Sequence, residues 1–482
     1  MRSDAGPQVN GMPTGLKTSR YTRLVPADDG WMLLYNALTN SFARVPPPLH
    51  DAVREILRDP DGSAGDAGQA ATLKAELRKG GFLVDSGLDE LGLQRLTNRA
   101  SRFATTHLGL TIAPTMACNF RCSYCFEERR SETMTPEVED AVVAFVERRA
   151  RQIQALSLSW FGGEPTLRLD IIERLVGRLG TLCKDKDIAF PPMSMITNGY
   201  LLTRDVVTVL KRLNITGVQI TLDGPPEVHD SRRRLANGGA TFATILENVK
   251  AALGILDVSV RINIDRSNVT ALDGLFDVFA ASGLGGKLPF YFGQVQPYGD
   301  ACADIGSACL STQEYSALIL DLQRRAREKG LTTPVRYPSA HTYGYCTADR
   351  VSGFVVAPSG ALFKCYSEIG ADLRHSVGSV LSGDVETYQL NNLCRYLNWD
   401  PYQDPECSAC YCLPICAGGC PFLAHRRGDT CACVDFKFNL DEVLKLKYDE
   451  VKRAGKLTLR ADGPEEQRGD SPDTVGPLQG QG

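Results

Sequence analysis

The sequence predicts an α/β fold in which a parallel sheet curls into a partial barrel of six strand–helix units. Two observations carry this prediction. From His107 onward, short apolar segments alternate with longer segments of helical periodicity, and such alternation is typical of parallel sheets with right-handed crossovers. Several apolar segments also end in glycine or a polar side chain, at the strand ends where parallel sheets place their chemistry. The expected strands are Leu108–Ala113, Leu156–Phe161, Met193–Thr197, Val218–Leu222, Val258–Ile264 and Leu288–Val295. The expected helices between them are Thr135–Gln152, Leu169–Cys183, Thr203–Leu213, Thr241–Ile255 and Ala271–Ala281.

Length and composition narrow the class of protein. A chain of 482 residues predicts roughly two to four domains. The net charge of −4 gives no basic field for nucleic acid, and no apolar run reaches the length of a membrane span. The first residues lack the apolar region of a signal peptide, so the 16 cysteines indicate metal ligation in a reducing compartment. We therefore expect a cytoplasmic protein with neither a nucleic-acid partner nor a membrane partner.

The segment before the alternation predicts a small module of three strands and two helices. Residues 1–18 are rich in Gly, Pro and Ser and are expected to be disordered. Pro46-Pro47-Pro48 marks the first turn of one helix, and Gly80-Gly81 ends the other. The expected strands are Tyr21–Val25, Trp31–Tyr35, Ser41–Val45 and a short closing strand at Phe82-Leu83-Val84; the helices run through Leu57 and over Ala71–Lys79, and a linker helix covers Leu88–Phe103.

Three cysteines follow the first strand of the barrel at a CxxxCxxC spacing. They are Cys118, Cys122 and Cys125. Three thiolates so close together can hold three corners of a cubane iron–sulfur cluster and leave the fourth iron open to a ligand. The alternatives are buried structural thiols or part of a zinc site, but zinc needs a fourth ligand and none follows in the next turn.

The second strand ends in Phe161-Gly162-Gly163-Glu164-Pro165, where the glycines allow close backbone approach and Glu164 offers a carboxylate. Together with the cysteine loop, this segment resembles the signature of radical S-adenosylmethionine (radical SAM) enzymes. The resemblance implies a [4Fe-4S] cluster on the three cysteines, with SAM bound to the open iron. It also implies that Gly162, Gly163 and Glu164 receive the SAM amino group, that Tyr124 packs near the adenine, and that Asn198 and Asp223 line the SAM pocket.

For Asn198 and Asp223 the alternative is turn formation. Arg232-Arg233-Arg234 either meets the SAM carboxylate or a peptide, or forms a solvated helix entrance.

The same resemblance implies the chemistry. An electron, from a donor such as flavodoxin or ferredoxin, cleaves SAM into methionine and a 5′-deoxyadenosyl radical that abstracts hydrogen from the substrate. The reactivity belongs to the cofactor, while the protein orients it and excludes water.

A second cysteine-rich region follows residue 340. A hairpin is expected at Phe354–Ala357 and Leu362–Cys365. The cysteine pattern from Cys346 to Cys433 resembles the SPASM extension of radical SAM peptide maturases, which holds one or two auxiliary iron–sulfur clusters, expected to be [4Fe-4S]. The resemblance assigns Cys346, Cys365 and Cys420 to the first cluster, and Cys407, Cys410, Cys416 and Cys433 to the second, with Cys431 as the rival of Cys433. The fourth ligand of the first cluster stays open between Cys394, Cys412, Cys431 and a substrate thiolate. A pair of structural zinc sites is the alternative.

The element order of the N-terminal module resembles the winged-helix-like element that captures leader peptides. The expected domains are 1–18 disordered, 19–86 peptide-recognition module, 87–104 linker helix, 105–300 radical SAM partial barrel, 301–340 linker helix region, 341–455 SPASM domain with a closing helix, and 456–482 disordered tail. This architecture implies a maturase that modifies a ribosomally made precursor peptide, by a thioether or another cross-link. The alternatives are a sulfatase-type maturase that generates formylglycine, and a catalytically silent iron–sulfur protein that binds peptides.

Overall fold

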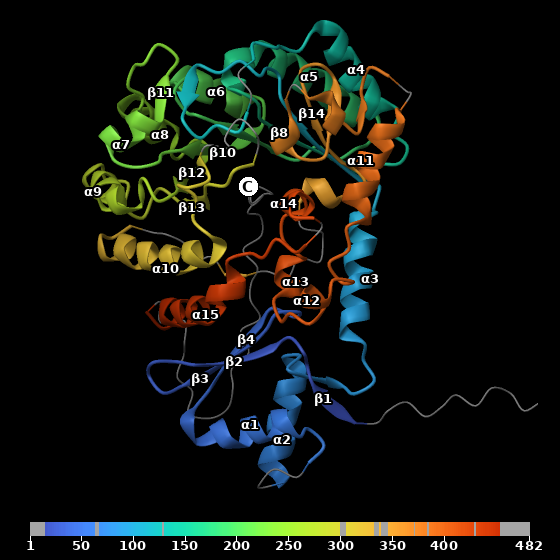
Figure 1. Ribbon diagram of the computed structural model, residues 1–482, viewed down its shortest axis with the longest axis vertical. Coiled ribbons are helices and arrows are strands. Elements are labelled where there is room, and N and C mark those ends of the chain that lie inside the picture. Colours follow the sequence, from blue (N-terminus) through green and yellow to red (C-terminus); the bar gives the residue numbers. More distant parts are fainter. Residues whose placement is uncertain are drawn as a thin grey trace, which may run out of the picture.

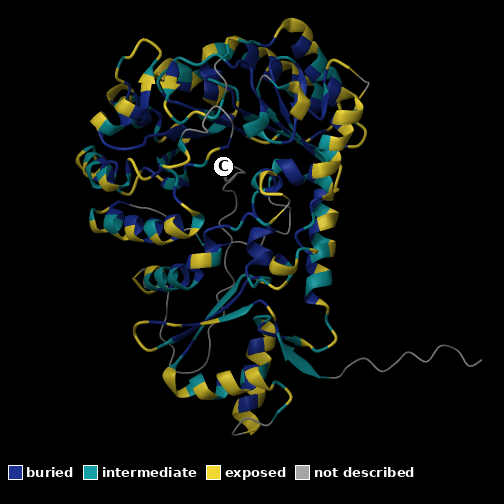
Figure 2. Ribbon diagram, viewed as in Figure 1, coloured by how far each residue is buried: buried dark blue, intermediate teal, exposed yellow. Residues whose placement is uncertain are grey.

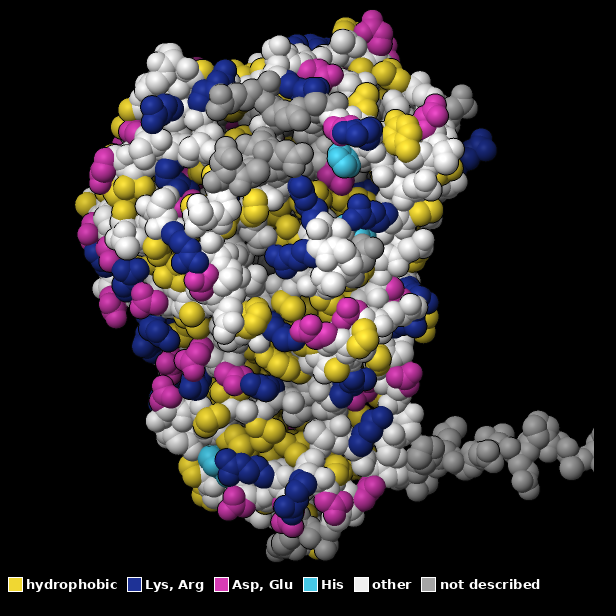
Figure 3. Space-filling model, viewed as in Figure 1, with side chains coloured by type: hydrophobic (Ala, Val, Ile, Leu, Met, Phe, Trp, Pro, Cys, Tyr) yellow, Lys and Arg dark blue, Asp and Glu magenta, His cyan; other side chains and the backbone are white. Residues whose placement is uncertain are grey.

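The computed structural model describes residues 15–62, 67–127, 130–298, 305–331, 337–338, 346–370, 372–382, 385–428 and 430–453. The expected disordered tail over 456–482, and residues 1–14 of the expected disordered start, lie outside these ranges. Among the described helices, none is long and apolar enough to cross a membrane. On the face shown in Figure 3, basic and acidic side chains are interspersed.

A nine-stranded sheet forms the centre of the upper part of the molecule (Figure 1). Six of its strands are parallel neighbours in chain order, and they confirm all six expected strands. Their bounds are β6 (His107–Ile112), β8 (Ala155–Trp160), β9 (Met193–Thr197), β10 (Ile215–Thr221), β12 (Asp257–Ile264) and β13 (Phe290–Gln294). Because the strands run in one direction, their carboxyl ends meet at one edge, where the loops that follow them converge.

Helices connect these strands as expected. They are α4 (Pro136–Glu147), α5 (Leu169–Asp185), α6 (Arg204–Arg212), α8 (Phe242–Ala252) and α9 (Leu272–Ala281). The helix expected over Thr135–Gln152 ends earlier, at Glu147, and the polar residues after it form turns. The buried residues of these helices and of the sheet form one large hydrophobic core, and Figure 2 shows the burial concentrated on the sheet side of the helices.

The C-terminal region is joined to the same sheet. The expected hairpin is confirmed as β14 (Gly353–Val356) and β15 (Ala361–Phe363), but β14 also pairs in parallel with β6, and β16 (Gly378–Ser379) extends the sheet further. The cysteine-rich segment then folds into short helices between the sheet and the N-terminal module (Figure 1). The helices of this half are α10 (Thr312–Glu328), α11 (Thr387–Asn398), α12 (Pro405–Ser408), α13 (Leu413–Cys416), α14 (Pro421–Arg426) and α15 (Phe436–Arg453).

The N-terminal module has the expected element order. Its antiparallel sheet consists of β2 (Thr22–Pro26), β3 (Met32–Asn36) and β4 (Ser41–Val45); its helices are α1 (His50–Arg58) and α2 (Ala67–Lys79). The expectation of disorder over residues 1–18 is wrong for Leu16–Thr18, which form β1 and pair with β5 (Leu83–Asp85). The two strands are far apart in the sequence, so a pattern read within a few residues does not predict their pairing.

The module does not stand apart from the rest of the chain. Every residue of β3 is buried, so both faces of the small sheet are covered. Met32 and Leu34 pack with α1 and α2, whereas Leu33 and Tyr35 pack with the cysteine-rich segment and α15. The linker helix α3 (Glu90–Arg102) runs alongside the cysteine-rich helices and connects the module to the large sheet (Figure 1).

Candidate active site

The three-cysteine loop lies at the carboxyl end of β6. Part of it forms the short strand β7 (Phe120–Cys122), which pairs with β11 (Arg233–Leu235) beyond the fourth parallel strand, so that Cys122 lies opposite Arg233. This pairing anchors the loop against the helix α7 (Pro226–Arg232) that follows β10. The cysteine loop is therefore held by an element more than a hundred residues away.

A cleft of about 1050 Å³, including its open mouth, lies against this loop. It brings together all three cysteines of the loop and four of the other expected site residues, which are Tyr124, Gly162, Gly163 and Asn198. Glu164 and Asp223, the remaining two, are not on its wall and are fully buried. The other residues lining the cleft are Phe120, Phe126, Glu127, Phe161, Ile196, Thr197, Gln219, Thr221, Arg233, Arg261, Asn263, Gln294, Val295, Gln296, Tyr298 and Tyr366.

The two glycines after β8 are needed for contact with the cysteine loop itself. Gly162 has a φ of +123°, and a Cβ added to it would lie 2.4 Å from the Thr115 carbonyl oxygen. A Cβ on Gly163 would lie 2.4 Å from the carbonyl oxygens of Met116 and Ala117. The Gly163 N–H donates to the Thr115 carbonyl at 3.1 Å. The glycines thus let one loop close directly on the chain that leads into Cys118.

Glu164 links the ends of two neighbouring strands. Its carboxylate accepts hydrogen bonds from the Thr166 amide at 3.0 Å, the Thr166 hydroxyl at 2.6 Å, the Thr197 hydroxyl at 2.7 Å and the Asn198 amide at 2.7 Å. Burial raises the pKa of this carboxyl group, while the same hydrogen bonds lower it. Both carboxylate oxygens are thus engaged within the protein, and the role expected for Glu164 toward the SAM amino group stays a prediction.

Tyr124 and Asp223 belong to one buried network. The Tyr124 hydroxyl donates to the Asp223 carboxylate and accepts from Arg233 at 2.7 Å and from Asn263 at 3.1 Å. Asp223 also accepts from the Asn263 amide at 3.1 Å. This network attaches Tyr124, which directly precedes the third cysteine, to the ends of β10 and β12.

Two of the three arginines at the end of α7 are buried rather than solvated. Arg232 is buried, forms an ion pair with Asp265 at 2.9 Å, and stacks on Tyr124 with its guanidinium carbon 4.8 Å from the ring centre. Arg233 is also buried and lines the cleft. Arg234 alone of the three is exposed.

Asn198 forms a turn and contacts the cysteine loop at the same time. Its side-chain oxygen accepts from the Tyr200 amide at 3.0 Å, and its side-chain amide donates to Asn119 at 2.8 Å. Asn119 lies directly after Cys118. The loop is therefore supported by the ends of three parallel strands.

The donor set fits an iron–sulfur cluster. Burial raises the pKa of Cys118 and of Cys125 to about 12, so their thiols would be protonated at neutral pH without a cation beside them. Iron favours the thiolate form strongly. The opposite Arg233 lowers the pKa of Cys122, against the larger effect of burial. Three convergent thiols on the wall of a cleft are thus suited to hold a metal cluster open to that cleft.

The cysteines assigned to the first auxiliary cluster lie together. Burial raises the pKa of Cys346, Cys365 and Cys420, and Cys420 raises the pKa of the other two further. Cys346 and Cys365 each accept a hydrogen bond on sulfur, from the Ala348 amide at 3.3 Å and the Ser367 amide at 3.4 Å. Such bonds favour thiolates, so this group also suits iron.

The second C-terminal group contains more cysteines than expected. A small pocket is lined by Cys407, Cys410, Cys412, Cys416, Cys431 and Cys433. A hydrogen bond from the Cys412 thiol and the nearby Lys437 lower the pKa of Cys410 to about 6, which makes it a thiolate at neutral pH. Cys412 and Cys431 line this pocket, whereas Cys394 is exposed on α11.

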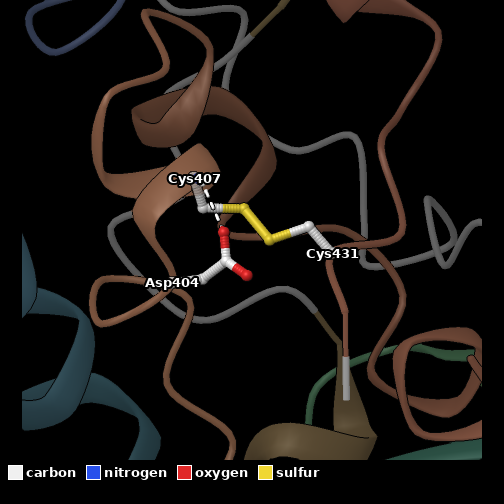
Figure 4. A group of neighbouring side chains, drawn as sticks. All are labelled: Asp404, Cys407 and Cys431. Atoms are coloured by element: carbon white, nitrogen blue, oxygen red, sulfur yellow. Dashed lines mark hydrogen bonds between the residues drawn. A yellow bond between two sulfur atoms is a disulfide. The ribbon is translucent and has the colours of Figure 1, made fainter. Parts of the chain in front are cut away.

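Cys407, an expected ligand of the second cluster, is not a free thiol in this structure, and its role as a ligand stays a prediction. It forms a disulfide bond with Cys431, and the Asp404 carboxylate, which accepts from the Cys407 amide at 2.8 Å, lies beside this bond (Figure 4). A disulfide sulfur is not a thiolate ligand, so Cys407 cannot hold a cluster in this state. The sequence does not reveal the pairing because the two cysteines are 24 residues apart and meet only through the folding of α12 to α14.

Several cleft residues have no motif in the sequence. Asn263 and Arg261 occupy alternate positions of β12 that face inward, and Tyr298 and Tyr366 follow β13 and Cys365. The period-two alternation of β12 shows which side chains point inward, but not that they meet the cysteine loop.

Comparison with known proteins places this site in a family. Residues 112–265 match the model of the Radical SAM superfamily. A probable GTP 3′,8-cyclase of Saccharolobus solfataricus is 31% identical over 163 residues, 34% of this chain, and the match spans about half (49%) of the cyclase's length. A cysteine-type anaerobic sulfatase-maturating enzyme of Clostridium novyi is 23% identical over 376 residues, 71% of this chain and 96% of that enzyme. The mycofactocin maturase MftC of Mycolicibacterium smegmatis is 27% identical over 342 residues, 68% of this chain and 81% of that protein.

The fold comparison agrees with the sequence comparison. The solved structure of native anSMEcpe with bound AdoMet has a TM-score of 0.53 at 18% identity and covers 71% of this chain and 100% of its own. This likeness concerns the fold. The residues matched by the family model include the cysteine loop and the glycine pair, which line the cleft, and Asp223, which binds Tyr124 on its wall. Residues 112–265 of this chain therefore carry a radical SAM domain.

Proposed function

We propose that this protein modifies a ribosomally made precursor peptide by forming a thioether or another cross-link. The observation that carries the proposal is that one cleft borders two cysteine groups. The three-cysteine loop lies on its wall, and so does Tyr366, which follows Cys365 of the first C-terminal group. A substrate segment in this cleft would lie between two cysteine groups suited to iron.

The cofactors would be held by residues already described. Cys118, Cys122 and Cys125 would hold a [4Fe-4S] cluster, and SAM would lie between this cluster, the glycine pair and Tyr124. When bound, the cluster and SAM supply reductive carbon–sulfur cleavage and a radical that removes hydrogen from the substrate. The chain's own part is to fix the loop through Gly163, Asn198 and β11, and to line the cleft with the aromatic side chains of Phe126, Phe161 and Tyr366, which exclude water.

The C-terminal groups would hold one or two auxiliary clusters. Cys346, Cys365 and Cys420 supply three ligands, and an open fourth position would suit a substrate thiolate. In the second group, Cys410, Cys416 and Cys433 are free thiols. Cys407 would join them once its disulfide is reduced.

The N-terminal module would bind the leader part of the peptide. β4 is an edge strand of the small sheet, and its residues are mostly half-buried rather than covered. An extended peptide can add a strand to such an edge. The partners implied are therefore a precursor peptide and an electron donor such as flavodoxin or ferredoxin, in the cytoplasm.

A second candidate is a sulfatase-type maturase that oxidises cysteine or serine to formylglycine. The extent of the match to the Clostridium novyi enzyme favours it. The additional module at the N-terminus favours the peptide cross-linking enzyme instead. Mass spectrometry separates the two, because formylglycine formation and cross-linking leave different mass changes on the peptide.

The deciding experiment uses anaerobically reconstituted full-length protein. We expect about twelve irons per chain if all three sites hold four-iron clusters, and 5′-deoxyadenosine on addition of SAM and a strong reductant. About four irons with bound zinc, and cleavage retained, would reject the auxiliary clusters. Full iron content without SAM cleavage would support the silent peptide-binding alternative.

A further inference from the structure

Arg261 occupies an unusual place in the cleft. Along β12, Val258, Val260 and Ile262 are buried on the helix side, and the alternating residues face the interior of the sheet. Two of these inward residues, Arg261 and Asn263, line the cleft. The Asn263 side chain donates a hydrogen bond to Tyr124, whereas Arg261 lies two residues further from the carboxyl end of β12.

The neighbouring strand makes room for the guanidinium group. Its Nε donates to the Asn263 side-chain oxygen at 2.7 Å. A Cβ added to Gly293 of β13 would lie 2.5 Å from this Nε and 2.7 Å from one of the terminal nitrogens. The guanidinium therefore lies against Gly293, in a space that the side chain of any larger residue at position 293 would occupy.

Arg261 has no acidic partner among the described residues. Among the described residues, the guanidinium group of Arg261 makes one hydrogen bond, to Asn263, and no ion pair, in contrast to the buried Arg232, which pairs with Asp265. Burial lowers the pKa of Arg261, but tyrosine hydroxyls, led by Tyr291 and Tyr366, raise it overall, so the group is charged. Glu127 is the acidic residue among those lining the cleft, and no ion pair joins it to Arg261 among the described residues. A cation enclosed without an anion is costly, which indicates that a ligand supplies the anion.

The position of Arg261 indicates which ligand this is. Arg233, the other guanidinium on the wall, lies opposite Cys122 and contacts Tyr124, at the cysteine-loop end where SAM is proposed to bind. The neighbours of Arg261 include Tyr298 and Tyr366, whose rings both contact Phe126, and Tyr366 directly follows Cys365, so this position lies between the two cysteine groups. A carboxylate that meets Arg261 would thus belong to the peptide segment between the two cysteine groups.

We propose that Arg261 is a substrate-binding residue that takes a carboxylate of the peptide, either an Asp or Glu side chain or a free C-terminus, close to the residue that is modified. The inference rests on the proposed peptide-modifying function. Guanidinium and carboxylate groups form paired, charge-assisted hydrogen bonds, which distinguish an acid from its isosteric amide.

The test uses the reconstituted full-length enzyme with SAM and no reductant, so that no turnover occurs. Two random nonapeptide libraries serve as probes, one amidated at the C-terminus and one with a free C-terminus, and bound peptides are read by mass spectrometry. We expect wild type to enrich Asp or Glu over Asn or Gln about tenfold at one position, or free over amidated termini by a similar factor. The first result assigns the carboxylate to a side chain and the second to the terminus.

Three variants and one control make the test specific. Arg261→Gln should abolish the enrichment because it removes the charge. Gly293→Ala should abolish it because the added Cβ would occupy the space of the guanidinium group. Arg261→Lys should retain part of the enrichment. Arg178→Gln, an exposed arginine paired with Asp140 far from the cleft lining, should leave it unchanged. SAM affinity, measured by equilibrium dialysis, should be the same in wild type and in Arg261→Gln.

Two results would overturn the proposal. One is a wild type that shows no preference for acids in either library. The other is an Arg261→Gln variant that keeps the preference or loses SAM affinity tenfold, which would place Arg261 at the SAM carboxylate. SAM cleavage by the reduced wild type is measured separately, so failure of the proposed function is distinguished from failure of this inference.

Discussion

At the scale of single residues, the site is organised by buried polar groups that bind one another. Glu164 accepts four hydrogen bonds from the ends of β8 and β9, and Tyr124 joins Asp223, Arg233 and Asn263. Such networks are stable only when every member has its partner. The residues that the sequence marks as candidate SAM contacts thus also hold the strand ends in register around the cysteine loop.

Replacing Glu164 by Gln tests this structural role. The amide NH₂ would face hydrogen-bond donors, so we expect the free energy of unfolding to fall by about 1.5–3 kcal/mol. Denaturant titration of the iron-free protein measures this effect. Glu173→Gln, at an exposed pair with Arg212, is the control and should change stability by less than about 0.5 kcal/mol. Unchanged stability with weakened SAM binding would instead favour a direct role toward the cofactor.

The disulfide of Cys407 gives a prediction about iron loading. If the bond must open before the second group binds a cluster, reconstitution without a thiol reductant should yield about four irons fewer per chain than reconstitution after dithiothreitol treatment. Cys431→Ser frees Cys407 and should remove this dependence on reductant. Equal iron content in Cys407→Ser and wild type after reduction would show that Cys407 is not a ligand.

At the scale of elements, the segment after β8 and the strand β11 contact the cysteine loop directly through backbone atoms. Gly163 is the tightest of these contacts, because a Cβ there would meet two backbone carbonyl oxygens. Backbone cannot give way as a flexible side chain does, so the element that would move is the cysteine loop itself.

Gly163→Ala should therefore impair the first cluster selectively. We expect it to lose about four irons together with SAM cleavage, and to keep the iron of the C-terminal groups. Gly177→Ala is the matched control: nothing lies within 4 Å of a Cβ at this position of α5, and removing a helical glycine should stabilise the protein by about 0.5–1 kcal/mol. Retention of full iron and activity in Gly163→Ala would contradict this account of the loop.

The strand β3 separates two cores. Leu33→Ala and Leu34→Ala both remove a fully buried side chain and should each cost about 2–5 kcal/mol. Only Leu33 packs with the cysteine-rich segment, so we expect Leu33→Ala, and not Leu34→Ala, to release iron from the second C-terminal group faster when a chelator is added. Identical release rates would mean that the module and this group are not coupled.

At the scale of the whole molecule, the N-terminal module, the cysteine-rich segment and α15 share one core. Ion pairs cross the same boundary, as between Arg23 and Asp441 at 2.8 Å and between Lys452 and Asp29 at 2.7 Å. These charges are partly exposed and contribute little, so the apolar contacts carry most of the association.

Removal of the module should then damage the remainder of the chain. A protein that begins at residue 87 would expose the apolar surface of α15 and of the second cysteine group. We expect it to aggregate or to lose iron from that group, as measured by size-exclusion chromatography with iron analysis. A truncated protein that stays monomeric with unchanged iron content would show that the module does not stabilise the rest of the chain.

The sequence by itself determined the parallel sheet, its six main strands and the residues of the cysteine and glycine motifs. These features are local: an apolar run, a glycine pair or a cysteine spacing is readable within a few residues. The tertiary structure decided what those residues touch. The pairing of β1 with β5, the joining of β14 to β6, the Cys407–Cys431 bond and the position of Arg261 against Gly293 all bring together segments distant in the chain. Such contacts depend on packing of the whole molecule, and no local pattern encodes them.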